Sequence, residues 1–598
     1  MVVAIFFSFF AVFFLAPPLV FAEGSLLQSA SSGEIHYYSF LAEGCTRPGF
    51  DTWLLVDMKY SGYLDPDCHL FPDYSYIPGA YAKVYITYYL NDAPPLTIEY
   101  PYLNGYRMTV NVDAVVGEGK DVSFVIDLAA SKVNFGSCVP AERVMYFSYS
   151  PQEGGGPWHG ASAQVAIPHS FPCAGGPDNY SYDDWYYYDV ANFYDWIVAL
   201  DKEFWFVEGN TLPGFDEWIC VLNPNKDPAR LEFSYFLQGG GVKVVKAEVP
   251  PKRRATFFVP DHVGRGKEVS LRLRSDIPVF AERPTYFAYR SQWSRPGKVW
   301  TGGHTSTGYS GALTDKGMVK VTNHYSAYAR WFPFVTYGRV PGIGWGESWL
   351  CVYNPHNHAV KFRIVLNHVD GVIIVEREAP PLQRATFSLV SLFPYHAGYS
   401  HQDPGTMIVA TKPSYDDFLF FEVPTYMELE GRQYYPAAGF PPSGGFSVIG
   451  SHPILHAAGP DFPEGCTLSG FETWFFFSPM YPKVYTGVTK DKYPAVKYRA
   501  HFSDGVGTHV KEKPLDLRGW ITASVRLGEW WPGKEISGNW WSGPSSCRIV
   551  TFRYQGGFCG LHGSMGYLER SNSCRIEGGF PLGFRIYPEG SEEAPIVR

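Results

Sequence analysis

One short motif occurs four times along the chain, and this repetition limits the possible folds more than any other feature. Gly-Phe, an acidic residue, any residue and Trp occur in this order at 49–53, 214–218 and 470–474, and a looser copy, Trp-Gly-Glu-Ser-Trp, occurs at 345–349. The four copies end at Trp53, Trp218, Trp349 and Trp474. Neighbouring copies lie about 125 to 165 residues apart, which is the size of one small domain. The sequence therefore predicts tandem domains arranged like beads, rather than one large core.

Two further landmarks follow each Trp in the same order. Pro-Pro, then Arg-Ala-Thr-Phe, occurs at 250–257 and 380–387, and Glu-Arg, then Tyr-Phe, occurs at 142–147 and 282–287. The fourth copy keeps weaker counterparts at 518–520 and 547–552. These ordered landmarks predict four repeat units at residues 23–170, 171–308, 309–442 and 443–598, the last with a C-terminal extension.

The pattern within a unit is that of β-structure. Residues 269–274 alternate between apolar and polar side chains, and residues 231–236 end at three glycines, so that 242–249 is the expected hairpin partner. About seven short strands per unit, separated by turn residues, are typical of a sandwich. We therefore expect an all-β fold of four tandem β-sandwich units, Ig-like or jelly-roll-like, with little helix beyond a short one near 190–200. Each landmark Trp is expected in the core of its unit.

The first 22 residues have the pattern of an export signal. Residues 2–22 are almost wholly apolar and end in Val-Phe-Ala, which predicts a signal peptide over residues 1–22. An uncleaved membrane anchor is the alternative, because the run is just long enough to span a bilayer. The sequence thus predicts an extracellular or cell-surface protein.

Ten cysteines fit an oxidising compartment. Local bridges Cys45–Cys68 and Cys559–Cys574 are favoured by spacing. Cys220 and Cys351 each follow a landmark Trp by two residues, and positions i and i+2 share one face of a strand. We expect these two cysteines to be buried free thiols.

Several functional classes lack their sequence signals. The chain has 49 basic and 58 acidic residues and no basic stripe, which argues against nucleic-acid binding. Zinc-type cysteine spacing, a P-loop and a Gly-x-Ser-x-Gly elbow do not occur in the sequence. No cofactor or metal site is predicted.

The landmarks contain a repeated acid–Arg–acid set. A glycosidase uses a pair of carboxylates, but a catalytic pair normally occurs once per chain. An Arg fork can instead satisfy two carboxylates at once, so we interpret each set as a structural clasp within one unit and the chain as non-enzymatic. The clasp residues are Asp51, Arg107, Glu142, Asp216, Arg254, Glu282, Glu347, Arg384, Glu422, Glu472 and Arg518.

Aromatic residues offer a second hypothesis, because they make up 17% of the chain. Planar rings in loop-like segments can stack on sugars, or they can pack between domains. The residues that would stack are Trp185, Tyr187, Trp530 and Trp540.

The order Glu-Gly-x-Thr, Gly-Phe-Asp-x-Trp, Arg-x-Thr and Glu-Arg-x-x-Tyr-Phe resembles an uncharacterised tandem β-repeat of secreted or surface bacterial proteins, with the best match at 208–287. The resemblance implies an exported display or stalk module without established catalytic residues. We therefore expect a non-catalytic structural or adhesive protein of the cell envelope or of an extracellular assembly. Its expected partners are polysaccharide or other surface proteins, and its oligomeric state is left open. A carbohydrate-binding protein is the alternative, and a glycoside hydrolase is the third hypothesis.

Overall fold

The computed structural model is built almost entirely of strands, so the predicted all-β fold with little helix is confirmed. Among the described residues, no helix is long and apolar enough to cross a bilayer. The structure describes residues 35–58, 82–103, 105–130, 140–169, 199–310, 329–340, 343–368, 371–393, 405–411, 418–429, 443–449, 460–479, 495–514, 523–542, 549–557, 560–564 and 567–568. The predicted signal peptide and the expected helix near 190–200 fall outside these residues, apart from 199–200.

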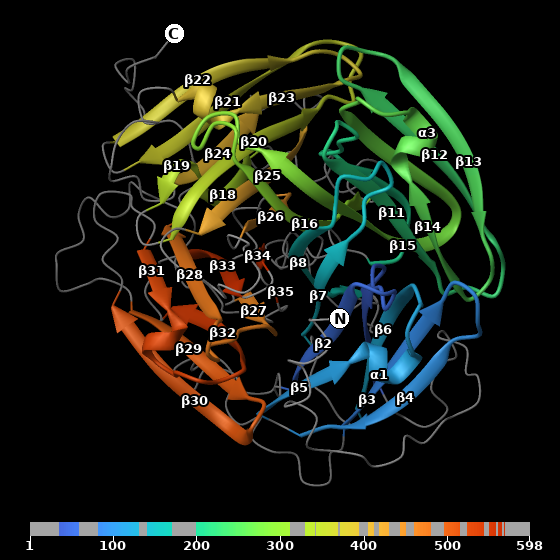
Figure 1. Ribbon diagram of the computed structural model, residues 1–598, viewed down its shortest axis with the longest axis vertical. Coiled ribbons are helices and arrows are strands. Elements are labelled where there is room, and N and C mark those ends of the chain that lie inside the picture. The colour runs from blue at the N-terminus through green and yellow to red at the C-terminus, as the bar shows by residue number, and fades with distance from the viewer. Residues whose placement is uncertain are drawn as a thin grey trace, which may run out of the picture.

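We describe the strands by the sequence repeat, or unit, to which they belong. In the first unit, a five-stranded antiparallel sheet lies near the rim of the molecule, and four further strands lie nearer its centre, where they form one end of a nine-stranded sheet that continues into the fourth unit (Figure 1). We call them the outer and inner sheets. The outer sheet contains β1 (Ile35–Leu41), β3 (Ala82–Leu90), β4 (Leu96–Pro101), β6 (Val122–Ala130) and β9 (Ile167–His169). The inner sheet contains β2 (Phe50–Met58), β5 (Tyr106–Asn111), β7 (Ala141–Tyr149) and β8 (Trp158–Val165), and the short helix α1 is Val112–Val116.

The strands of the second unit pair in the same way, except that one long strand, β15 (Val269–Arg290), runs through both sheets. Its outer-sheet partners are β10 (Asp201–Phe206), β12 (Ala229–Leu237), β13 (Val242–Val249) and β17 (Tyr309–Ser310). The inner sheet adds β11 (Phe215–Asn223), β14 (Arg253–Phe258) and β16 (Val299–Thr307), and α3 is Val259–Val263.

The third unit has a four-stranded outer sheet of β18 (Ala329–Val335), β21 (Val360–His368), β22 (Gly371–Ala379) and β24 (Gly405–Thr411). Its inner strands are β19 (Tyr337–Val340), β20 (Gly344–Tyr353), β23 (Arg384–Ser388), β25 (Phe420–Leu429) and β26 (Ser443–Val448), with α5 at Leu389–Leu392.

The fourth unit has outer strands β27 (Pro460–Phe462), β29 (Ala495–Phe502), β30 (Gly505–Pro514), β32 (Ile536–Ser542) and β35 (Tyr567–Leu568). Its inner strands are β28 (Glu472–Pro479), β31 (Ala523–Arg526), β33 (Ile549–Gly557) and β34 (Gly560–Ser564), with the 3-10 helix η13 at Leu527–Glu529.

Two strands lie beyond the predicted unit ends. β17 pairs with β10 of the second unit, and β26 pairs with β25 of the third. Strand pairing therefore continues past 308 and 442, where the sequence predicts the second and third units to end.

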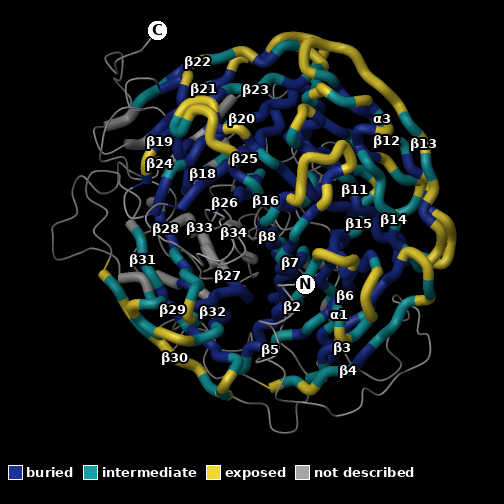
Figure 2. The backbone as a smooth tube through the Cα atoms, viewed as in Figure 1, coloured by how far each residue is buried: buried dark blue, intermediate teal, exposed yellow. Residues whose placement is uncertain are grey.

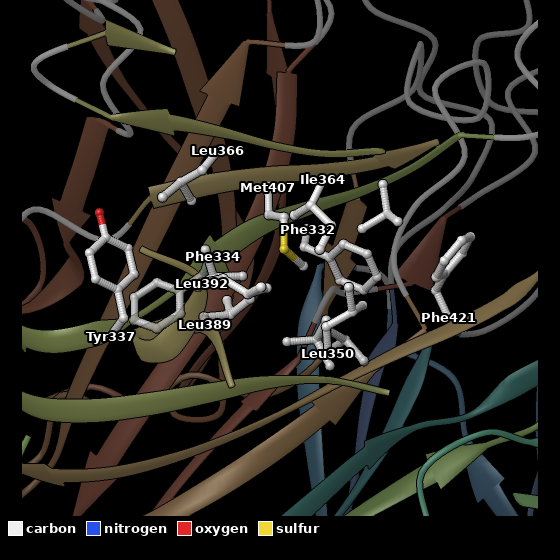
Figure 3. Packing of buried hydrophobic residues seen from close by; sticks show 14 of the residues in the cluster. Phe332, Phe334, Tyr337, Leu350, Ile364, Leu366, Leu389, Leu392, Met407 and Phe421 are labelled. Atoms are coloured by element: carbon white, nitrogen blue, oxygen red, sulfur yellow. The ribbon is translucent and has the colours of Figure 1, made fainter. Parts of the chain in front are cut away.

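Each unit buries an apolar core between its two sheets, as the alternating sequence requires. The predicted β12–β13 hairpin forms, and the alternating run in β15 places Leu271 and Leu273 in the core while Arg274 is exposed. Figure 3 shows the core of the third unit, where Phe332, Leu350 and Met407 meet from β18, β20 and β24.

The units form a closed ring rather than beads on a string. Figure 1 shows the last strand of each inner sheet at the centre of the molecule, and these strands contact one another in the cyclic order β8, β16, β26, β34 and back to β8. Figure 2 shows that exposed residues gather on the rim, as at β13 and β30, while most residues of the central strands are buried where their burial is described. The first and fourth units are thus neighbours in space.

Glycines allow the central strands to approach closely. A Cβ atom added to Gly160 of β8 would lie 2.5 Å from the Cα atom of Gly302 in β16, and one added to Gly302 would lie 2.6 Å from the Cα atom of Gly444 in β26. The Thr301 hydroxyl also donates to the His159 carbonyl at 2.8 Å, which links β16 to β8. Backbone meets backbone here, so no flexible side chain can give way.

We predict that Gly302→Ala destabilises the protein by about 1–3 kcal/mol, because the added methyl group overpacks the centre of the ring. Denaturant unfolding of the full chain measures this change. Gly528→Ala is the matched control, since a Cβ atom there meets nothing within 4 Å. Equal unfolding midpoints for the two variants would contradict the prediction.

Candidate functional site

The landmark arginines reach into the preceding unit of the ring. Strand β14 pairs with β11 and places Arg254 opposite Leu222, at the edge of the inner sheet. From there its Nη1 atom lies 3.4 Å from the Gly44 carbonyl oxygen and 3.7 Å from the Asp121 carboxylate, both in the first unit. Arg254 is only 3% exposed, so its charge is neutralised inside an interface between two units.

The other described landmark arginines make the corresponding contacts. Arg384 of the third unit donates to the Gly209 carbonyl and lies 3.7 Å from Glu268, both in the second unit. Arg107 of the first unit donates to the Pro463 carbonyl at 3.2 Å and lies 3.5 Å from Glu535 of the fourth unit.

The landmark glutamates accept hydrogen bonds across the same interfaces. The backbone N–H of Glu43 donates to Glu282 at 2.7 Å, and that of Glu208 donates to Glu422 at 2.8 Å. At the interface between the fourth and first units, the N–H of Glu464 donates to Glu142 at 3.1 Å. Each of these carboxylates is buried, and each holds the start of the Glu-Gly segment of the preceding unit.

Two of the acids that lie two residues before a landmark Trp, Asp216 and Glu347, anchor a loop of the preceding unit. Asp216 accepts from the Tyr149 hydroxyl at 2.8 Å and the Gln152 N–H at 3.0 Å. Glu347 does the same for the second unit and accepts from the N–H groups of Trp293 and Ser294 at 3.0 and 2.7 Å. These hydrogen bonds hold the pKa of Glu347 below its usual value, although burial acts to raise it.

The prediction that each acid–Arg–acid set pairs with itself inside one unit is therefore wrong. The partners of Asp216, Arg254 and Glu282 include residues of the first unit, because the three landmarks line one face of the second unit that the first unit covers.

Glu472 instead forms an ion pair with Arg526 of its own unit. Burial raises the pKa of Asp51. Arg518 lies outside the described residues.

A second arginine turns two of these interfaces into buried ion clusters. Arg143 pairs with Glu43 at 2.7 Å inside the first unit. Its counterpart Arg283 lies 2.5 Å from Glu208 and 2.8 Å from Glu422, so one guanidinium joins the second and third units. Burial would raise the pKa of Glu422, but Arg283 lowers it well below its usual range.

Trp218 and Trp349 lie at the interfaces and not in the unit cores, which corrects our expectation for these two landmark tryptophans. Trp218 packs in a cluster of residues from the first and second units, and its Nε1 atom donates to Tyr149 of the first unit at 3.3 Å. Trp349 repeats this contact with Tyr289 of the second unit at 3.2 Å. The two tyrosines in turn stack on the next unit, for example Tyr149 on Tyr286 with ring centroids 4.4 Å apart.

The cysteine predictions are confirmed in part. Cys220 and Cys351 are buried free thiols, as expected, and burial raises the pKa of each to about 12. Cys45 is also a buried free thiol, so the predicted bridge to Cys68 is not formed. The Cys559–Cys574 pair lies outside the described residues.

The acidic partners of the landmark arginines were missed. Asp121, Glu268 and Glu535 each stand in a Gly-Lys-acid-aliphatic-Ser segment, at 119–123, 266–270 and 533–537. This fourth repeated motif was visible in the sequence. The structure also corrects the position of the last landmark in the fourth unit. In the first unit, the landmark Glu142 lies opposite Leu55, which follows the landmark Trp by two residues. The equivalent residue of the fourth unit, Phe476, lies opposite Phe552, so Phe552 holds the place of the landmark glutamate.

The aromatic residues proposed for sugar stacking are not gathered on one described surface. Trp540 is 2% exposed and packs in the core of the fourth unit, so its ring is closed to a sugar in solution. Trp530 is half-buried against the same core. Trp185 and Tyr187 lie outside the described residues.

Metal-binding groups are not clustered in the part of the chain that the structure describes. His304 lies near the centre of the ring on β16, and its two ring nitrogens have no hydrogen-bond partner among the described residues. Burial lowers its pKa to about 3, which keeps the imidazole neutral.

No protein-family model and no curated protein matches the chain. Solved structures with local similarity include Thermotoga maritima 1070, at 19% identity, 18% coverage of this chain, 94% coverage of that one and a TM-score of 0.16. The Anabaena sensory rhodopsin transducer has 16% identity, coverages of 14% and 86%, and a TM-score of 0.13. A Streptomyces avermitilis alpha-L-rhamnosidase has 10% identity, coverages of 82% and 55%, and a TM-score of 0.11. Similarity at this level transfers no function to this chain.

A double-mutant cycle separates the interface contact from a clasp within the unit. We expect Arg254→Ala to destabilise the full chain by about 1.5–3 kcal/mol, because it removes a buried charged donor from the Gly44 carbonyl and the Asp121 carboxylate, although Asp121 keeps its ion pair with Arg47 at 2.5 Å. Arg254 and Asp121 should show a coupling energy of about 0.5–3 kcal/mol when both are changed to Ala. The effects of Arg254→Ala and Asp216→Ala on stability should be additive. Urea unfolding measures both cycles. Coupling of Arg254 to Asp216 but not to Asp121 would instead support a clasp within the unit.

The buried Glu217 predicts a pH dependence of stability. Burial raises its pKa from 4.5 to about 8 in the folded protein. Between these values the unfolded chain releases the proton while the folded chain keeps it, so stability falls as the pH rises through this window. Glu217→Gln keeps an acceptor for the Asn210 N–H, which lies 2.6 Å from the carboxylate, and removes the titration.

We therefore expect Glu217→Gln to gain up to about 4 kcal/mol relative to the native chain between pH 5 and pH 8. Urea unfolding at both pH values gives the difference. The exposed Glu248→Gln is the matched control. Parallel pH profiles for the native chain and Glu217→Gln would rule out the buried titration.

Proposed function

We propose that this chain is a non-catalytic structural or adhesive protein that acts outside the cell or at its surface. The observation that carries the proposal is the use of the repeated charges. Arg107, Arg254 and Arg384 each bind a preceding unit, and so do Glu142, Glu282 and Glu422. Groups that neutralise one another inside buried interfaces serve assembly rather than catalysis.

The ring suits a display role. Four packed units form one body, and the exposed hairpins on its rim are available to other molecules. The apolar N-terminal run supports export. Polysaccharide and other surface proteins are the proposed partner classes.

Labelling of intact producing cells tests the proposal. An antibody against the full chain should label unpermeabilised cells or detect the protein in the medium, and deletion of the chain should reduce attachment to polysaccharide or to neighbouring cells. Detection only after permeabilisation would refute the proposed location. Hydrolysis of glycans by the purified protein that is abolished by changing one carboxylate would refute the non-catalytic role.

A further inference from the structure

The interface between the fourth and first units, which we call the seam, is built differently from its equivalents. The chain passes directly from the first unit to the second and from the second to the third. The first and fourth units are separated in sequence by the other two. Their contact is held by side chains and by a short backbone pairing of β5 with β29, which consists of a parallel bridge between Tyr106 and Phe502, together with the bond from the Gly507 N–H to the Gly105 carbonyl at 2.9 Å.

The seam buries a polar pair where the other interfaces bury apolar ones. Asp57 corresponds to Leu222 and Tyr353, since each follows its landmark Trp by four residues. Its Oδ1 atom lies 2.6 Å from Nδ1 of His501, and both side chains are almost fully buried.

Strand pairing identifies the residues of the other units that hold the same position as His501. It lies opposite Ser537 on the neighbouring strand, as Tyr89 lies opposite Ser123 and Phe236 opposite Ser270.

At the other two interfaces these positions are filled by apolar contacts. Leu222 and Tyr89 belong to one buried cluster between the first and second units. Tyr353 and Phe236 pack with ring centroids 4.7 Å apart between the second and third units. Burial of such apolar side chains stabilises an interface, whereas a buried polar or ionic pair is often no better than neutral, because desolvation offsets its attraction.

The seam also lacks one backbone hydrogen-bond donor that the other two interfaces have. The residue before the Glu-Gly segment is Ala42 in the first unit and Val207 in the second, and the N–H groups of these residues help to bind Glu282 and Glu422. Pro463 holds the same place in the fourth unit and has no N–H to donate. Tyr146 at the seam is also only half-buried, while its counterparts Tyr286 and Tyr426 are buried.

We propose that the ring opens and recloses at the seam while the contacts between the first, second and third units stay formed. The Asp57–His501 pair makes the seam the weakest of these three interfaces, because it replaces apolar burial with a desolvated polar contact. Thr508 accepts or donates at the other imidazole nitrogen of His501, at 3.3 Å, and keeps the pair oriented when the ring is closed. The device is a conformational gate between the two terminal units.

Amide hydrogen exchange of the full chain, resolved to single residues, tests the gate. The N–H groups of Glu43, Glu208 and Glu464 are equivalent, since each donates to a carboxylate across one interface. We expect Glu464 to exchange at least about tenfold faster than the other two. Ile536 reports on the fourth unit itself, because its N–H donates to the Gly465 carbonyl within that unit.

Slow exchange at Ile536 together with fast exchange at Glu464 supports opening at the seam. Equal exchange at Glu43, Glu208 and Glu464 overturns the proposal, and so does fast exchange at Ile536, which would indicate unfolding of the whole unit.

The double variant Asp57→Leu with His501→Phe tests the cause of the opening. It should slow the exchange of Glu464 about tenfold and leave Glu208 unchanged, because it rebuilds the apolar contact of the other interfaces. An unchanged Glu464 rate in the folded variant rejects the role of the pair. If the variant fails to fold, the comparison of the three amides in the native chain still decides where the ring opens.

Discussion

The structure depends on the pairing of buried charges between neighbouring units. An isolated charge in an apolar interface is costly, and it becomes tolerable only when a partner and hydrogen bonds satisfy it. Each described interface that buries such charges receives partners and hydrogen bonds from both of its units. An arginine reaches into the preceding unit, and a glutamate accepts a hydrogen bond from a backbone N–H of that unit. A unit that lost its neighbour would leave these groups exposed or unpaired.

This reciprocity explains why the same residues recur along the chain. In a ring, each unit presents one face to the unit before it and another to the unit after it, so similar faces need similar charges. The repeat is clearest where both faces are used in the same way, as in Arg254 and Arg384. It weakens in the fourth unit, where Glu472 pairs with Arg526 of its own unit.

The strands and the free thiols could be predicted from the sequence because they depend on local alternation. The alternation in β15 and the face shared by Trp218 and Cys220 are both properties of one strand. The partners of Arg254 could not be predicted, since they lie more than a hundred residues away in another unit. Trp218 was misplaced for a similar reason, because a large apolar residue suits an interface as well as a core.

Splitting the chain tests most directly whether the landmarks join the units. Fragments cut within residues 170–198 would separate Asp121 from Arg254, and sedimentation velocity can measure the dissociation constant of the pair. The account predicts a one-to-one complex whose dissociation constant rises at least about tenfold with Arg254→Ala, equivalent to about 1.4 kcal/mol. Fragments that do not associate, or an unchanged constant in the variant, would contradict it.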